Sequence, residues 1–291
     1  MKNNPDFEIG DFIFRFFRKH AASFQANICK ASITGNPKDI HRARLDVKKI
    51  FAIFDLLRIL RPKTEKDPEY EKLFKKLYKA SGRLREVQIN LLLLTGDEFT
   101  GYDLEPFTAY LREQERESTA DFLDLVRKFD EDELTWVEKR IKKEIGRITP
   151  AILHKKTNRY IHDKTAWIMY LIDNGDDEKK LHRIRQQMKE LGTVLSIVTS
   201  VRPAGQVEKV ISGLNKTEML IGDWHDRVIL AGSMETFIDQ AKTPEPSSLA
   251  PVRDCYLWLS GTNGQLFEKM TRDARAFISP GPSSVLHSTE R

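Results

Sequence analysis

The chain has 291 residues, of which 40% are hydrophobic and 31% are charged, and its formal net charge at pH 7 is +5. This composition excludes a globally disordered chain and supplies enough apolar residues for one large domain or two small ones. A positive excess of this size indicates a polyanionic partner only where the cations are clustered.

Cysteine usage and the apolar segments limit the environment of the protein. Cys29 and Cys255 allow at most one disulfide and no disulfide framework. The apolar N-terminal stretch FIFRFFRKH is interrupted by Arg15 and Arg18, so it fits neither a signal peptide nor a membrane span. The run INLLLL is too short to cross a bilayer. The sequence therefore predicts a soluble, cytoplasmic protein with no membrane partner.

Helical periodicity runs through most of the chain, and the alternating pattern of strands is scarce. Joints rich in Gly, Pro and Asp, such as TGNPKD and RPAG, separate the periodic segments. The pattern predicts helices over residues 7–33, 38–60, 67–94, 104–129, 131–148, 150–173, 177–200, 206–240, 252–260 and 264–277. It also predicts a linker at KTPEPSSLAP (242–251) and a frayed tail at 279–291.

Two of these helices begin with capping signals. Asn36 can cap the helix at 38–60, and the proline that follows it suits the first helical turn. Asp176 or Asp177 can cap the helix at 177–200, where acidic side chains also suit the positive end of the helix dipole. Each of the two long helices carries a histidine near its start.

The helix at 38–60 has one basic and one apolar face. At about 100° per residue, Arg44 and Lys48 fall within about 60° of His41. Arg42 and Lys49 lie at the edge of this stripe. The opposite side is apolar and is expected to be buried: Ala43, Val47, Ile50, Phe54 and Leu57.

The helix at 177–200 repeats the arrangement. His182, Arg185 and Lys189 form the stripe, and the apolar face consists of Ile184, Met188, Leu191, Leu195 and Val198. A second motif also recurs, as GRLRE at 82–86 and GDWHD at 222–226. Aligning their glycines pairs Arg85 with His225 and Glu86 with Asp226. Both motifs recur after about 140 positions, which indicates an internal repeat.

The segments IHRARLDVKK, GRLREV, LHRIRQQMKE and IGDWHD resemble the motifs of the CHAD domain, the conserved histidine α-helical domain. The resemblance implies an all-α fold of two similar four-helix bundles related by internal pseudo-twofold symmetry. It implies a first half at residues 1–148 and a second half at 149–278, with a flexible tail at 279–291. It further implies non-catalytic binding of inorganic polyphosphate in a basic groove shared by the halves, with possible association with polyphosphate granules.

Repeated cations on rigid helices suit this ligand, because polyphosphate offers charges but no bases to read. The expected contacts are His41, Arg44, Lys48, Arg85, His182, Arg185, Lys189 and His225, with Arg42, Lys49, Arg83, Arg183, Arg15, Arg18 and Lys19 as possible additions. His20 belongs to the same basic cluster near the N-terminus. If the histidines contribute charge, binding should tighten as the pH falls from about 8 to about 6. Glu86 and Asp226 are expected to orient neighbouring cations.

The sequence also departs from the family's pattern. Many members have an arginine ten residues after the histidine, where this chain has Phe51 and Gly192. The pair Lys48–Lys49 corresponds to Lys189–Glu190 in the second half. These departures predict a groove that is less basic than usual.

Two alternatives to polyphosphate binding stay open, a metal-binding or a nucleic-acid-binding helical regulatory protein. His154 and His162, with Asp163 nearby, could share a helix face, although a structural role is the simpler reading. Phosphate backbones could also occupy the basic stripes, but no zinc-finger or RNP-like motif accompanies them. Phe51, Phe54 and Trp136 are expected to pack in the core. No phosphate-binding glycine loop or catalytic triad is evident, so we expect neither catalysis nor a cofactor or bound metal.

Overall fold

The computed structural model describes residues 5–60, 70–174, 178–201, 205–240 and 246–278. Every regular element in these ranges is helical, as the sequence predicted: α1 (Pro5–Thr34), α2 (Pro37–Leu60), α3 (Tyr70–Leu93), a short 3-10 helix η1 (Asp97–Phe99), α4 (Glu105–Arg127), α5 (Glu131–Ile145), α6 (Pro150–Asp173), α7 (Glu178–Val201), α8 (Gly205–Gln240) and α9 (Pro246–Ile278). The protein is therefore all-α across the described residues.

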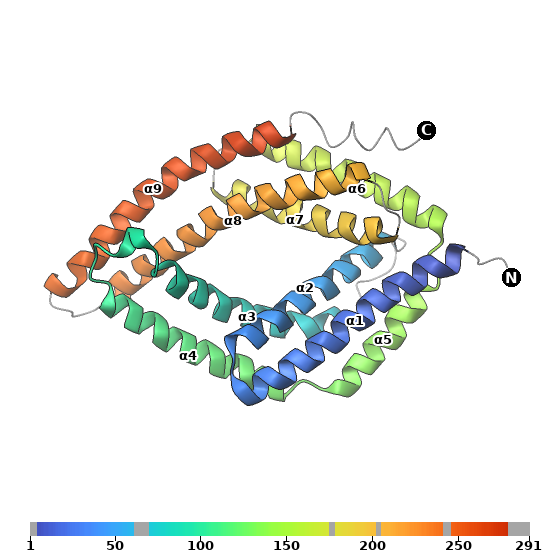
Figure 1. The fold of residues 1–291 in the computed structure, drawn as a ribbon, viewed down its shortest axis with the longest axis horizontal. Coiled ribbons are helices and arrows are strands. Elements are labelled where there is room, and N and C mark those ends of the chain that lie inside the picture. Colours follow the sequence, from blue (N-terminus) through green and yellow to red (C-terminus); the bar gives the residue numbers. More distant parts are fainter. Residues whose placement is uncertain (1–4, 61–69, 175–177, 202–204, 241–245, 279–291) are drawn as a thin grey trace.

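The helices form a flat, elongated assembly in which α2, α3, α7 and α8 lie in the middle (Figure 1). The contacts agree with this view, because α2 packs on α3 and α7, and α8 packs on α3 and α7. The remaining helices lie around this centre, with α1, α4 and α5 along one long side and α6 and α9 along the other. The four central helices are the ones that carry the repeated motifs.

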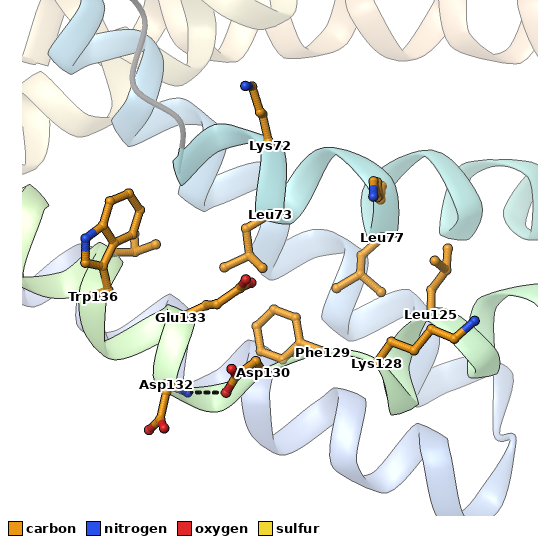
Figure 2. Close-up of a pocket in the computed structure, with 12 residues that line it drawn as sticks. Lys72, Leu73, Leu77, Leu125, Lys128, Phe129, Asp130, Asp132, Glu133 and Trp136 are labelled. Carbon is orange, nitrogen blue, oxygen red and sulfur yellow. Dashed lines mark hydrogen bonds between the residues drawn. The ribbon is translucent and has the colours of Figure 1, made fainter.

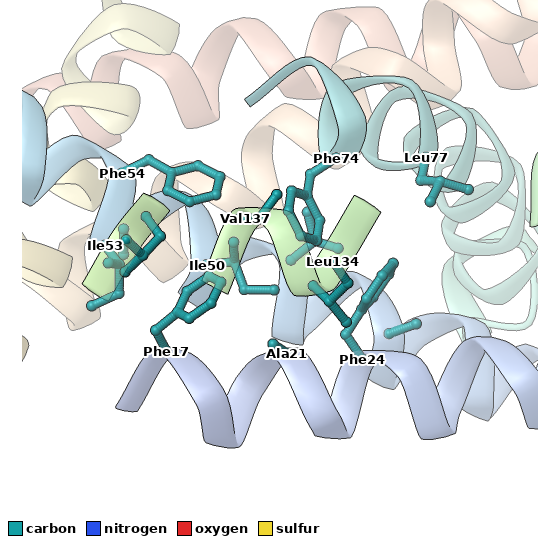
Figure 3. Packing of buried hydrophobic residues seen from close by; sticks show 14 of the residues in the cluster. Phe17, Ala21, Phe24, Ile50, Ile53, Phe54, Phe74, Leu77, Leu134 and Val137 are labelled. Carbon is teal, nitrogen blue, oxygen red and sulfur yellow. The ribbon is translucent and has the colours of Figure 1, made fainter. Parts of the chain in front are cut away.

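A large apolar core joins α1, α2, α3 and α5 (Figure 3). Phe17 and Phe24 of α1 pack towards Phe54 of α2 and Phe74 of α3, and all four side chains are buried. The predicted apolar face of α2 is confirmed as buried. On α7 the predicted face is buried from Ile184 to Leu195, while Val198 is half-buried. These helices therefore present their basic stripes away from the core.

Two further apolar clusters complete the interior. One joins α6, α7 and α8 to Met270 of α9, and the other joins Phe99 and the start of α4 to α8 and α9. In the second of these clusters, Trp258 of α9 packs edge-on against Phe99. The boundary between the predicted halves falls between α5 and α6, and this cluster crosses it. The division into two symmetric bundles stays a prediction.

The cap predicted at Asn36 is confirmed, because its side-chain Oδ1 accepts a hydrogen bond of 2.9 Å from the backbone N–H of Lys38. The N-terminal cap of α6 is Thr149, whose hydroxyl accepts from the backbone N–H of Ile152. The capping proposed for Asp176 or Asp177 lies outside the described residues, as does the tail at 279–291.

The C-terminal region differs from the prediction. A linker and two short helices were expected there, but α9 is one helix that contains Pro251. Its buried residues keep a spacing of three or four along much of the helix, at Leu249, Val252, Cys255, Leu259 and Asn263. This stripe packs into the cluster with Phe99, and Met270 further along α9 packs into the other cluster, which offsets the backbone hydrogen bond that proline cannot donate.

Three further expectations have definite outcomes. Trp136 was expected in the core, but its residue is 42% exposed and its indole lies beneath Arg140 instead. Cys29 is exposed and Cys255 is buried, and both are free thiols rather than a disulfide. In the described part of the chain, no helix combines the length and apolar character that a bilayer crossing requires.

Candidate anion-binding site

The two basic stripes meet where α2 packs against α7. We call His41, Arg44 and Lys48 the α2 stripe, and His182, Arg185 and Lys189 the α7 stripe. The pKa of Lys48 is lowered to about 8, chiefly by burial and then by the positive charges of Lys189, Arg44 and Arg185. Charges on α7 act on Lys48 in this way only at short range. The fold therefore gathers the cations of both stripes into one cluster.

Arg44 is held by neutral groups of α3. Its Nη1 donates to the carbonyl oxygen of Tyr78 at 2.9 Å and to the hydroxyl of Ser81 at 3.5 Å. The guanidinium also lies over the Tyr78 ring, 4.3 Å from its centre. A Cβ atom added to Gly82 would lie 3.3 Å from Nη1 of Arg44. The glycine of the GRLRE motif therefore makes room for the arginine of the α2 stripe.

Arg185 occupies a similar place beside α8 but has a charged partner. Its Nη2 lies 3.4 Å from Oε1 of Glu218, and Nζ of Lys189 lies 3.2 Å from the same oxygen. A Cβ atom on Gly222 would lie 3.1 Å from Nη2 of Arg185. The buried Nε of Arg185 has no hydrogen-bond partner among the described residues. Both motif glycines therefore leave room for a guanidinium that a larger side chain would displace.

The histidines of the cluster favour the neutral form. Burial, followed by the charges of Arg85, Lys48 and Arg44, lowers the pKa of His41. Burial and then Arg185 and Lys189 lower the pKa of His182. In His225, burial and then its neighbour His182 lower the pKa to about 4. At neutral pH these rings therefore supply hydrogen-bonding groups rather than charge.

The rings of His182 and His225 lie close together, with centroids 4.7 Å apart. This contact joins the α7 stripe to the second motif on α8. The buried Nδ1 of His41 has no hydrogen-bond partner among the described residues. A phosphate oxygen could accept a hydrogen bond from such a ring when the nitrogen carries the proton.

The motif carboxylates lie near the cations and near each other. Burial raises the pKa of Glu86, with Arg44 opposing the shift and Asp226 adding to it. Burial also raises the pKa of Asp226, against the charges of Arg185 and Arg85. The charges of Arg44 and Arg185 act on Glu86 and Asp226 respectively, and the orienting role expected of these acids stays a prediction. The groups that actually contact the stripe arginines are Tyr78, Ser81 and Glu218.

A groove with a volume of about 340 Å³ lies between the central helices beside this cluster. Lys48, Lys49 and Lys189 line it together with three acids, Asp55, Glu190 and Glu218. Phe51 and Gly192, which stand where the resembled family often has arginine, also line the groove. Phe51 packs edge-on against Tyr78, so it supports the ring that carries Arg44.

Glu190 has its own cationic partner. Oε2 of Glu190 lies 2.6 Å from Nζ of Lys164, which reaches it from α6. Sequence reasoning missed Lys164, because no repeated motif includes it. Tyr78 and Glu218 carried a usable signal, since each stands four residues before a motif glycine. Their pairing with Arg44 and Arg185 became visible only in the structure.

The outlying predicted contacts are mostly exposed. Arg42 lies 3.7 Å from Asp39, and Arg83 lies 3.8 Å from Asp121. Arg183 and Lys49 are exposed beside the stripes. These four side chains could approach a ligand at the margin of the site.

Part of the basic cluster on α1, which consists of Arg15, Arg18, Lys19 and His20, pairs with acids of neighbouring helices. His20 lies 2.9 Å from the buried carboxylate of Asp46 on α2, and Arg18 lies 3.7 Å from Glu138 on α5. Arg15 and Lys19 are exposed. His20 and Arg18 are therefore involved in contacts between helices.

The metal alternative gains no support from the arrangement. His154 and His162 are both exposed, and they lie within hydrogen-bond distance of Asn158 and Asp163 respectively. Within the described ranges, no group of three or more His, Cys, Asp or Glu side chains is placed to hold a metal ion.

A second pocket, of about 780 Å³, lies between α3, α5 and the end of α4 (Figure 2). Its floor includes Leu73, Leu77 and Phe129, and Trp136 stands at one end. Its charges have both signs, from Lys72, Lys76, Lys128, Asp130, Asp132 and Glu133. None of the repeated motif residues lines this pocket, so we do not assign it to the anion site.

Comparisons with known proteins place these features in a family. A family model described as the CHAD domain matches residues 15–235. The fold is similar to the crystal structure of the CHAD domain from the plant Ricinus communis, with a TM-score of 0.72 and 14% sequence identity, over 92% of each chain. No curated protein matches the chain. At this identity the structural likeness establishes the fold, and the family match rests on the sequence itself.

Proposed function

This chain belongs to the CHAD domain family, and from that premise we propose that it binds inorganic polyphosphate without cleaving it. The observation that carries the proposal is that Lys48 of the α2 stripe and Lys189 of the α7 stripe line the same groove. A phosphate chain could run along these side chains and contact arginines from both helices.

The chemistry of the cluster suits a linear polyanion. Arginine can donate two parallel hydrogen bonds to one phosphate, and lysine supplies a compact charge. Arg44 is already fixed by Tyr78, so less side-chain entropy is lost on binding. Burial, followed by the charges of Lys189 and Arg44, lowers the pKa of Lys48, so this cation is poorly solvated and lies among like charges. Binding a polyanion would relieve this repulsion.

The proposed role is that of a binding module, and association with polyphosphate-rich granules would follow from it. A catalytic role would need a group to activate water or to bind a metal. Glu86 and Asp226 are the motif acids, and the charges of Arg44 and Arg185 act on them respectively, which suits an orienting role. We therefore expect polyphosphate to keep its length when it is incubated with the protein, with or without divalent metal.

The test is a titration with polyphosphates of defined length at several salt concentrations. We expect measurable affinity for chains long enough to reach both stripes, and a steep loss of affinity as salt rises, because bound counterions are released from the polyanion. A competition with duplex DNA at near-physiological salt separates the main alternative. Tighter binding of DNA than of polyphosphate would contradict the proposal.

The motif glycines provide a second test of the site. We expect Gly222→Ala to weaken polyphosphate binding by about threefold to tenfold. The new Cβ would displace Nη2 of Arg185, so the guanidinium could no longer donate two parallel hydrogen bonds to a bound phosphate. Fluorescence anisotropy with a labelled polyphosphate would measure the change.

Gly232→Ala is the matched control, since it lies on the same helix and nothing lies within 4 Å of its added Cβ. This variant should bind polyphosphate as the parent protein does, while gaining about 0.5–1 kcal/mol of stability from better helix propensity. Equal polyphosphate affinity in the two alanine variants would show that binding does not depend on the space that Gly222 leaves for Arg185.

A further inference from the structure

The two stripe arginines stand in equivalent places in their motifs but have different partners. Arg44 contacts Tyr78, four residues before Gly82, and Arg185 contacts Glu218, four residues before Gly222. The Tyr78 contacts are a carbonyl oxygen and an aromatic ring, both of which are neutral. The Glu218 contact is a carboxylate. The same motif position is therefore neutral beside one stripe and anionic beside the other.

Glu218 sits where a ligand oxygen would be expected to bind. One of its oxygens, Oε1, lies 3.4 Å from Arg185 and 3.2 Å from Lys189, so it bridges the two cations of the α7 stripe. The side chains of Arg185 and Glu218 are only 22% and 24% exposed, which limits the screening of this contact by water. A phosphate approaching the α7 stripe must displace this carboxylate or tolerate its repulsion.

Among the described residues, the α2 stripe has no carboxylate in direct contact with its cations, although the charge of Glu86 acts on Arg44 through space. In the part of the chain that the structure describes, no carboxylate lies within ion-pair distance of Arg44 or Lys48. The charge of Glu218 also acts on Lys48 through space and raises its pKa, but burial and the neighbouring cations outweigh it, and the direct contacts of Glu218 are with Arg185 and Lys189. The two stripes are therefore unequal before any ligand binds.

We infer that Glu218 is an internal counter-anion that makes the α2 stripe the primary site for polyphosphate and the α7 stripe a secondary one. This inference rests on the proposed function. The ligand engages Arg44 and Lys48 first, and it engages Arg185 and Lys189 by displacing the Glu218 carboxylate. Glu218 thus sets how many phosphates the site holds tightly.

The test is Glu218→Gln, which keeps the shape of the side chain and removes its charge. We expect polyphosphate affinity to rise by about threefold to tenfold, because two partly exposed ion pairs no longer compete with the ligand. The salt dependence should become steeper, since more phosphates are then neutralised by the protein. Glu117→Gln removes the same charge from an exposed acid on α4 that belongs to neither stripe nor motif, and it should leave the affinity nearly unchanged.

A double-mutant cycle with Lys189→Ala locates the effect. Loss of Lys189 should cost more affinity in the Glu218→Gln background than in the parent protein, because Glu218 no longer neutralises that lysine. Weaker binding by Glu218→Gln would assign Glu218 a positioning role and overturn the inference, and so would a gain no larger than that of Glu117→Gln. Failure of the parent protein to bind polyphosphate at all would instead overturn the proposed function.

Discussion

Replacing Arg44 and Arg185 together by alanine is expected to weaken polyphosphate binding by about 100-fold or more. Each arginine sits in a place prepared by a motif glycine and can donate paired hydrogen bonds to phosphate. Hydrogen bonds to charged groups contribute about 1.5–3 kcal/mol each, so losing two such donors accounts for this factor even at the lower end. Titration of the double variant with long-chain polyphosphate would measure the loss.

The matched comparison is the double variant Arg42→Ala with Arg183→Ala. These arginines are sequence neighbours of the stripes, carry the same charge and are exposed at the margin of the site. Their removal should cost less than about fivefold, chiefly through long-range electrostatics. Circular dichroism must show unchanged helical content in both double variants, because Arg44 also bonds to the Tyr78 carbonyl. Similar losses in the two would mean that total charge, rather than the stripe geometry, governs binding.

Polyphosphate affinity is expected to fall by about tenfold between about pH 8 and about pH 10, and Lys48 is the group responsible. In the free protein its pKa is lowered to about 8, chiefly by burial and by Lys189. A bound polyanion stabilises the charged ammonium and raises this pKa towards its ordinary value of about 10.4. Binding therefore takes up a proton in this range, and it weakens as protons become scarce.

Lys48→Arg provides the control for this pH effect, since arginine stays charged throughout the range. The decline of affinity between about pH 8 and about pH 10 should be much shallower in this variant. The experiment needs constant ionic strength, because salt alone changes polyanion binding. A decline of the same size in Lys48→Arg would assign the titration to another group.

The free energy of unfolding should rise with pH over the range in which polyphosphate affinity falls, and Lys48 is again the group responsible. The lowered pKa means that the charged lysine destabilises the folded state below about pH 8, and this penalty disappears as the pH rises through the unfolded value of about 10.4. Lys48→Met should therefore stabilise the protein near pH 7 while it weakens polyphosphate binding. The site then holds its charge at the expense of stability, as functional sites often do.

Near neutral pH, the histidines should contribute less to the pH dependence of polyphosphate binding than their positions in the motifs indicate. Burial and neighbouring cations lower the pKa values of His41 and His182, and that of His225 falls to about 4. Their change of charge in the free protein therefore lies below the ordinary value of about 6.5. The tightening expected between about pH 8 and about pH 6 consequently shifts to more acidic conditions.

Much of the helical architecture could be read from local pattern. Up to residue 240, the predicted helices in the described ranges end within three residues of those observed. The apolar faces of α2 and α7 could be assigned because helical periodicity depends only on neighbouring residues. The continuity of α9 was missed because a proline and two glycines interrupt its pattern, whereas burial against two apolar clusters keeps the helix continuous.

The sequence by itself determined which side chains share a face, namely the α2 stripe with His41, Arg44 and Lys48 and its counterpart on α7. It also determined that a glycine follows each stripe on the next long helix. Only the tertiary structure decided that Lys48 and Lys189 line one groove, that each glycine leaves room for an arginine, and that Glu218 pairs with the cations of the α7 stripe. The reason is that charge interactions and desolvation depend on distances between helices remote in the chain, which local periodicity does not specify.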